Sequence, residues 1–152
     1  MTALAPAVAA GEPWRLTDTY GPGPESEWGP REVLAHVGEM IPYWLGEIEL
    51  IVDAGAGAGG EAPGFGRLED DPIRVQIIGR DRRFPGRELL GRIEVEARRA
   101  AARFRALTEV ESNAVGRHVS RGELTVADIA ERLLVGHIEG HVTQLRELVA
   151  AR

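Results

Sequence analysis

The chain has 152 residues, the size of one domain, and a domain of this length buries enough surface to fold without disulfides. It contains no cysteine, which excludes disulfides, thiolate nucleophiles, iron-sulfur clusters and cysteine-ligated zinc. The formal net charge of -6 argues against a nucleic-acid-binding protein, because neutralising phosphates requires a basic surface. Any metal ion must therefore be held by histidine, aspartate or glutamate.

The N-terminal residues 1–10 are small and apolar, but they lack a basic region and Pro6 interrupts them, so they make a poor signal peptide. No stretch of the chain approaches about 18 uninterrupted apolar residues, the length that spans a bilayer. The sequence thus predicts a soluble, cytoplasmic protein with neither a membrane nor a nucleic acid as partner.

The first long periodic segment follows a Gly/Pro-rich connector at 21–30. Pro30 suits the first position of a helix, where its missing N–H has no intrahelical role. From Pro30 to about Asp53, apolar residues recur at steps of three and four and predict one helix face, formed by Val33, Val37, Met40, Trp44, Ile48 and Ile51. Pro42 lies inside this helix and is expected to bend it, because it removes a backbone donor.

Residues 53–66 are rich in glycine and predict a flexible loop. They contain the dinucleotide-binding pattern G-x-G-x-x-G at Gly55, Gly57 and Gly60. That pattern requires a strand before it and a helix beginning within it, whereas here a helix precedes it and Pro63 follows. A cofactor role for this segment is therefore disfavoured.

Residues 71–79 fit two structures. Asp71 and Pro72 can open a short helix, but the alternation of apolar residues from Ile73 to Ile77 also fits a strand.

Residues 86–107 predict a second long helix, with charges of alternating sign off an apolar stripe formed by Leu90, Ile93, Ala97, Ala100, Phe104 and Leu107. Such charges are typical of a solvated face. A last helix is expected to begin near Thr125, which with Asp128 forms a variant of the capping box, and to run to the end of the chain. With an Ala-rich helix at 2–10, these segments predict an all-α bundle.

Two histidines, His137 and His141, stand four residues apart in the segment GHIEGHVTQL of the last helix. At about 100° per residue they lie about 40° apart, near the middle of the apolar stripe formed by Val126, Ala130, Leu133, Leu134, Leu145 and Leu148. Both imidazoles should point into the bundle, where their nitrogens need partners. A metalloprotease H-E-x-x-H motif is excluded, since Ile138 follows His137 and Glu139 faces solvent.

His36 lies on the flank of the stripe of the first long helix. A third imidazole facing the other two would make a three-nitrogen metal site with open positions, which is typical of catalytic zinc, although imidazole also suits nickel, iron and copper. Periodicity alone explains His36 equally well as a half-buried helix residue. His118 lies in a connector, and we expect it at the surface rather than in the site.

Two segments carry a resemblance to a known family. EWGPREVLAHVGE (27–39) resembles the Trp-x-x-x-Glu-Val/Ile-Leu-x-His segment of the DinB-like superfamily, and TVADIAERLLVGHIEGHVTQLREL (125–148) is similar to its C-terminal His-x-x-x-His-x-x-Gln-Leu helix. The superfamily includes mycothiol-dependent maleylpyruvate isomerases and bacillithiol S-transferases. Residues 53–85 match nothing specific. The chain departs from the family in its Gly/Pro-rich N-terminal region and in Pro42.

The resemblance implies a single domain over 1–152, an up-down four-helix bundle of the DinB/YfiT type. It further implies a divalent metal ion, zinc or nickel above all, bound by His36, His137 and His141, and a low-molecular-weight thiol as co-substrate for a small-molecule substrate. Members of the family often form homodimers. Trp28 matches the tryptophan ahead of the first ligand helix, where we interpret it as packing.

Three functions stay open at this point. In the first, an enzyme uses its metal to deprotonate a thiol for transfer or isomerisation, or to activate water for hydrolysis. In the second, the metal site is non-catalytic, which saturation of its open positions by Glu39 or Gln144 would favour. In the third, the histidines are hydrogen-bonded core residues. No catalytic residue is assigned; Glu39 is the acidic residue expected near the metal, and Gln144 is expected to hydrogen-bond a ligand imidazole or a bound water.

Overall fold

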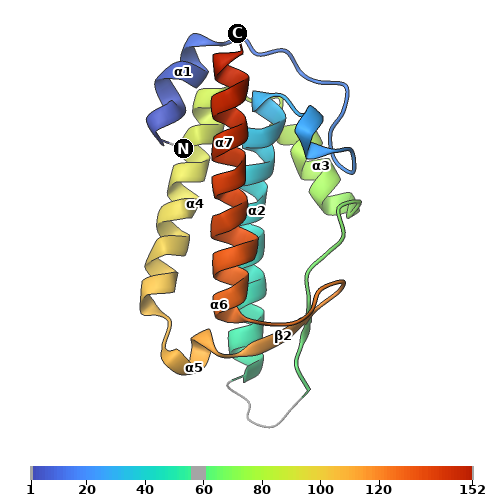
Figure 1. The fold of residues 1–152 in the computed structure, drawn as a ribbon, viewed down its shortest axis with the longest axis vertical. Helices are drawn as coiled ribbons and strands as arrows, with labels where there is room; N and C mark the ends of the chain where they lie inside the picture. The colour runs from blue at the N-terminus through green and yellow to red at the C-terminus, as the bar shows by residue number, and fades with distance from the viewer. Residues whose placement is uncertain (1, 56–60, 152) are drawn as a thin grey trace.

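The computed structural model describes residues 2–55 and 61–151, and three long helical segments make up about half of them (Figure 1). They are α2 (Pro30–Gly55), α4 (Gly86–Ala106) and a continuous run that consists of α6 (Val126–Asp128), the π-helix η3 (Ile129–Val135) and α7 (Gly136–Ala150). Figure 1 shows α2 and α4 running in one direction and α7 in the opposite one. The three long helices that the sequence predicts are thus present.

The shorter helices are η1 (Thr2–Leu4), α1 (Ala5–Ala10), η2 (Glu25–Glu27), α3 (Pro72–Asp81) and α5 (Glu109–Ser112). The ambiguous segment at 71–79 is therefore helical. The side chain of Asp71 accepts a hydrogen bond from the backbone N–H of Arg74, and Pro72 occupies the first turn, so both start signals act as expected for a helix. The Ala-rich start of the chain also forms its expected helix, but a short one.

A three-stranded sheet accompanies the helices, in the order β1 (Gly64–Phe65), β2 (Val115–His118) and β3 (Gly122–Thr125). β1 pairs parallel to β2, with Phe65 opposite His118, and β2 pairs antiparallel to β3. Gly122 closes the turn between β2 and β3 with a φ of 76°, a conformation that favours glycine. The fold is mostly helical as predicted, but an all-α bundle is not confirmed, because the prediction did not include this sheet.

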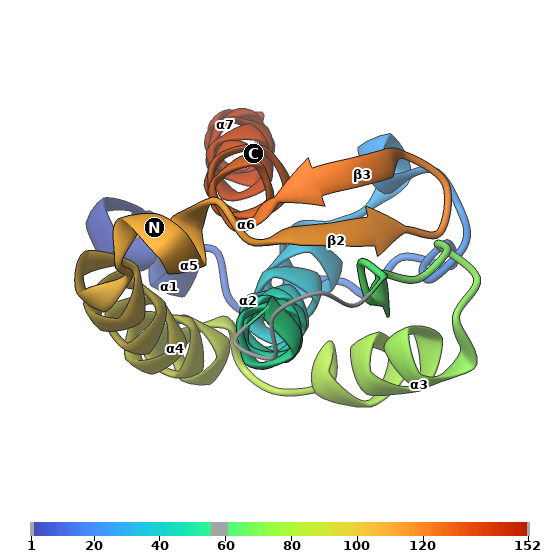
Figure 2. The ribbon, with the colours of Figure 1, turned by 90° about the horizontal axis from the view of Figure 1, so that it is seen from below.

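Seen along the long axis, α2 occupies the centre, α4 and α3 lie on either side of it, and α7 and the β2–β3 hairpin cover it (Figure 2). α1 has only six residues and α3 only ten, so the described chain has no fourth helix comparable in length to the other three. An up-down four-helix bundle of the DinB type is therefore not confirmed.

The predicted apolar stripes form the core. On α2, five of the six predicted positions are buried and Trp44 is half-buried; the buried ones are Val33, Val37, Met40, Ile48 and Ile51. The last helix begins as predicted, because Thr125 and Asp128 exchange the hydrogen bonds of a capping box. On α4 the exposed charges form i, i+4 pairs, such as Arg92 with Glu88, which confirms a solvated face.

Two further predictions concern the region after α2. Helix α2 continues through Pro42 to Gly55, and β1 occupies Gly64–Phe65, so the ends of the predicted loop at 53–66 are structured. Gly57 and Gly60 of the G-x-G-x-x-G pattern lie outside the described residues.

In the part of the chain that the structure describes, no helix is both long and apolar enough to cross a bilayer.

Candidate metal centre

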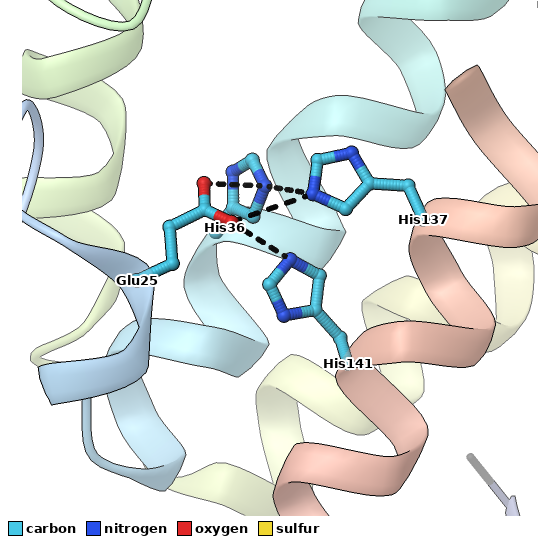
Figure 3. Close-up of side chains that lie close together, drawn as sticks. All are labelled: Glu25, His36, His137 and His141. Carbon is cyan, nitrogen blue, oxygen red and sulfur yellow. Dashed lines mark hydrogen bonds and ion pairs between the residues drawn. The ribbon is translucent and has the colours of Figure 1, made fainter. Parts of the chain in front are cut away.

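Four side chains from three elements converge at one point: Glu25 of η2, His36 of α2, and His137 and His141 of α7 (Figure 3). One nitrogen or carboxylate oxygen of each lies within 4.8 Å of those of the others. His137 and His141 lie one helical turn apart on the same face of α7. Because α7 packs on α2, both of their rings face His36. The two rings stack with their centroids 4.7 Å apart, and the ring of His36 lies 5.2 Å from one and 5.0 Å from the other.

The spacing of the donor atoms suits a metal ion. The Nε2 atoms of His36 and His137 are 3.5 Å apart, and the carboxylate oxygens of Glu25 lie 3.6, 3.5 and 3.6 Å from Nε2 of His36, His137 and His141. A tetrahedral ion with bonds of about 2.1 Å holds its ligand atoms about 3.4 Å apart. These four separations are long for direct hydrogen bonds but close to those around a shared ion.

The hydrogen bond at Gln144 determines how His141 faces the cluster. The amide NH₂ of Gln144 donates to the backbone carbonyl of Glu25, so its Oε1 is the atom that lies 2.9 Å from Nδ1 of His141. An amide oxygen only accepts, so Nδ1 of His141 carries the proton and Nε2 carries a lone pair. That Nε2 is buried without a hydrogen bond to any described residue. A metal ion would satisfy this lone pair, so the residues present fit a metal.

Glu25 is held firmly although it lies in a Gly/Pro-rich connector. Its Oε1 accepts a hydrogen bond of 2.8 Å from Arg74, a buried side chain that also donates to the carbonyl oxygens of Gly21 and Glu69. With Gln144 bound to its backbone, Glu25 is fixed from two elements, α3 and α7. The carboxylate is therefore oriented towards the histidines before any ion binds.

The environment of the cluster favours neutral imidazoles and an ionised carboxylate, which are the forms that bind a metal ion. Burial lowers the pKa of His36 well below its ordinary value, and the positive charge of Arg74 lowers it further. Burial also lowers the pKa of His141, although the hydrogen bond that its Nδ1–H donates to Gln144 acts in the opposite direction. Burial raises the pKa of Glu25, but its contacts with His137 and His141 and the positive charge of Arg74 outweigh this and lower it. Both imidazoles are thus neutral and the carboxylate is ionised near neutral pH.

A cleft of about 810 Å³ opens onto the cluster. Glu25, His36 and His137 line it, together with Trp44, which lies about 12 Å further along α2 than His36, and His118, which stacks on Trp44 and so marks the far end. Its volume falls in the range of small-molecule sites, which span about 300–1,000 Å³. A metal ion at the cluster would therefore be reachable by a small molecule.

Several predicted residues lie where the sequence places them. His36, His137 and His141 come together as predicted, and Glu139 is exposed. Gln144 makes its expected hydrogen bond to an imidazole. Trp28 packs as expected: it is buried, and its ring meets that of His36 edge to face at 5.4 Å.

Glu39 is not where the sequence places it. It is buried but outside the cluster, because the guanidinium of Arg67 binds both of its oxygens. Burial raises the pKa of Glu39, and Arg67 offsets this only in part. The acidic residue beside the histidines is Glu25, which sequence reasoning missed. Glu25 lies in a connector without periodicity, so no helical pattern could have indicated the direction of its side chain.

His118 also differs from its prediction. It is only 6% exposed, and it lies on β2 rather than in an irregular surface connector. As predicted, it is not among the four residues of the cluster. The alternation of buried and exposed residues along β2 turns Gly116 and His118 inward.

No protein-family model matches this chain, and searches of curated proteins and of solved structures found no significant match either.

Proposed function

We propose that this protein binds a divalent metal ion through His36, His137 and His141, with Glu25 as a fourth donor. The observation that carries the proposal is the set of separations of 3.5–3.6 Å that join the four donor side chains. The Nε2 of His141, which is buried without a hydrogen bond to a described residue, supports it. A set of three imidazoles and one carboxylate suits zinc or nickel, and we expect one of these ions.

We further propose that the chain is a DinB-like protein that transfers or isomerises a small molecule with the help of a low-molecular-weight thiol. The two sequence motifs support this, as does the cleft that reaches Glu25, His36 and His137. A bound divalent ion lowers the pKa of a coordinating thiol, so that the thiolate forms at neutral pH. The cleft admits the thiol and its partner, and Arg74 and Gln144 hold Glu25 and His141 in place. A homodimer, hydrolysis by activated water and a cytoplasmic location stay predictions.

A second function is favoured by one observation, the presence of Glu25. Structural zinc sites are closed by four protein ligands, whereas catalytic sites keep a position for water or substrate. If Glu25 occupied the fourth position permanently, the site would be a non-catalytic one that ties η2 to α2 and α7.

Elemental analysis of untagged protein tests the metal proposal. We expect about one zinc or nickel ion per chain, and none in the His36→Ala and His141→Ala variants. Glu139→Ala is the matched control, since it removes an exposed side chain from the same helix. Protein that carries no metal and takes up neither added zinc nor added nickel would rule the proposal out.

Cobalt substitution separates the two functions. L-cysteine added to the cobalt(II) protein should produce a thiolate-to-cobalt charge-transfer band if a thiol can enter the coordination sphere. Failure of the band to appear, with cobalt still bound, would favour the closed, non-catalytic site.

A further inference from the structure

The far end of the cleft is formed by His118, the one histidine outside the cluster. Its ring stacks on that of Trp44, with centroids 6.1 Å apart and planes 26° apart, and it meets the ring of Phe65 edge to face at 5.1 Å. The parallel pairing of β1 and β2 sets Phe65 beside His118. Gly66 completes the wall: a Cβ at this position would lie 2.6 Å from Nε2 of His118. The imidazole is therefore held in one orientation.

The hydrogen bond to Ser120 determines which nitrogen of His118 carries the proton. The backbone N–H of Ser120 lies 3.1 Å from Nδ1, and a backbone N–H only donates, so Nδ1 accepts. In the neutral ring the proton then resides on Nε2. That Nε2–H makes no hydrogen bond to any residue that the structure describes, in a wall that is otherwise aromatic. A donor on a residue that lines the cleft, without an acceptor among the described residues, is available to a molecule bound there.

The charges beside His118 indicate what kind of acceptor this is. Arg67 and Arg74 line the cleft but bind Glu39 and Glu25. Arg121 and Arg132 also line it, and neither forms an ion pair within the described residues.

Acidic groups also lie near this end of the cleft. Glu47 acts on the His118 ring with opposite sign to Arg121, but its carboxylate accepts a hydrogen bond from the backbone N–H of Gly66. Glu69 and Asp70 also line the cleft. Like Arg67, they lie on the loop that leads into α3. Of the two charges that act on the ring, Glu47 is hydrogen-bonded to Gly66, whereas Arg121 makes no hydrogen bond or ion pair with a described residue.

We propose that His118 and Arg121 form a subsite for the acidic group, a carboxylate or a phosphate, of a small molecule that occupies the cleft. The Nε2–H of His118 donates to one oxygen of that group and the guanidinium of Arg121 pairs with its charge, while Arg132 adds a second positive charge. The other end of the same molecule reaches Glu25, His36 and His137. That this molecule is the substrate rests on the proposed function; the subsite itself does not require the metal.

The experiment is a titration of metal-free, ¹⁵N-labelled protein with sodium phosphate and, separately, with sodium acetate, at fixed pH and ionic strength. The imidazole ¹H–¹⁵N correlations of His118 report binding. We expect these signals to shift saturably with at least one of the two anions, and the anion that binds more tightly identifies a phosphate or a carboxylate as the preferred group.

Three variants locate the site. Arg121→Gln, an exposed change, should weaken anion binding by about fivefold or more, and His118→Phe, which keeps the ring but removes the donor, should abolish it. Arg83→Gln is the matched control, since Arg83 is exposed, has no ion-pair partner in the described chain and does not line the cleft. Unshifted His118 signals with both anions, or equal weakening by Arg121→Gln and Arg83→Gln, would overturn the proposal. Because the protein is metal-free, failure here leaves the measured metal content, and hence the proposed function, unaffected.

Discussion

Three of the four histidines surround the carboxylate of Glu25, whereas the fourth, His118, lies between two aromatic rings at the other end of the same cleft. The three clustered histidines are carried by long helices, and His118 is carried by a short strand. In both regions a neighbour engages Nδ1 of a buried ring, but the neighbours are opposite in kind. The Gln144 oxygen accepts from Nδ1 of His141, and the Ser120 N–H donates to Nδ1 of His118.

The difference between these two neighbours decides what Nε2 can do. In His141 the proton is held on Nδ1, which leaves Nε2 with a lone pair suited to a metal ion. In His118 the proton is displaced to Nε2, which makes that atom a hydrogen-bond donor. One type of side chain thus provides a ligand at one end of the cleft and a donor at the other. Four predictions test this division of roles between the two regions, from the largest expected change in free energy to the smallest.

The largest effect is expected at the cluster. His141→Ala should weaken zinc binding by more than about 100-fold, or about 3 kcal/mol, because it removes a ligand rather than a supporting group. Isothermal titration with zinc measures this, and Glu139→Ala should bind as the unaltered protein does. Wild-type affinity in His141→Ala would mean that the histidines are core residues only.

Gly66→Ala should disturb the region around His118 and leave the metal cluster unchanged. Gly66 has a φ of 86°, and an added Cβ would lie 2.5 Å from Cδ2 of His118, so the substitution should lower the free energy of unfolding by about 2 kcal/mol. Zinc affinity should change less than about twofold, because distant sites act independently. Urea unfolding and zinc titration measure the two quantities. Gly64→Ala is the control, since nothing lies within 4 Å of its added Cβ. A matching loss of zinc affinity in Gly66→Ala would show that the two regions are coupled.

Gln144→Ala should weaken zinc binding by about tenfold, about 1.4 kcal/mol, because His141 loses the acceptor that keeps its proton on Nδ1 and Glu25 loses a backbone contact. Thr143→Ala, an exposed change one residue away, should have no such effect. If both variants bound zinc equally well, the tautomer argument for His141 would be wrong.

The smallest effect concerns pH. Burial lowers the pKa of His36 well below 6.5, so the unfolded state takes up a proton first as the pH falls. The stability of the metal-free protein should therefore be full above about pH 6.5 and decrease by about 1 kcal/mol per pH unit between there and the folded pKa. Urea unfolding at pH 7.5 and 5.5 measures this. His36→Gln should flatten the dependence more than His118→Gln does, since the pKa of His118 is lowered less strongly. A flat profile for the unaltered protein would contradict the buried, neutral state of His36.

Much of the framework could be predicted from local pattern. The stripes from Val33 to Ile51 and along the last helix place α2 and α7, and the same periodicity turns His137 and His141 inward and Glu139 outward, because a helix face repeats within one segment. The Thr125–Asp128 cap is local for the same reason. For His36, periodicity left a metal ligand and a half-buried helix residue equally open, and only the resemblance to the DinB-like superfamily favoured the ligand.

What only the tertiary structure decided involves residues that are distant in sequence. Strands of two and four residues are too short to show a period, and the pairing that buries His118 joins residues 64–65 to residues 117–118. Likewise, Glu39 lies one turn from His36 but is bound by Arg67, while Arg74 and Gln144 direct Glu25 to the histidines from a connector. A helical pattern indicates which way a side chain points from its own axis. Which partner it meets depends on loops and neighbouring elements whose positions are set only when the whole chain has packed.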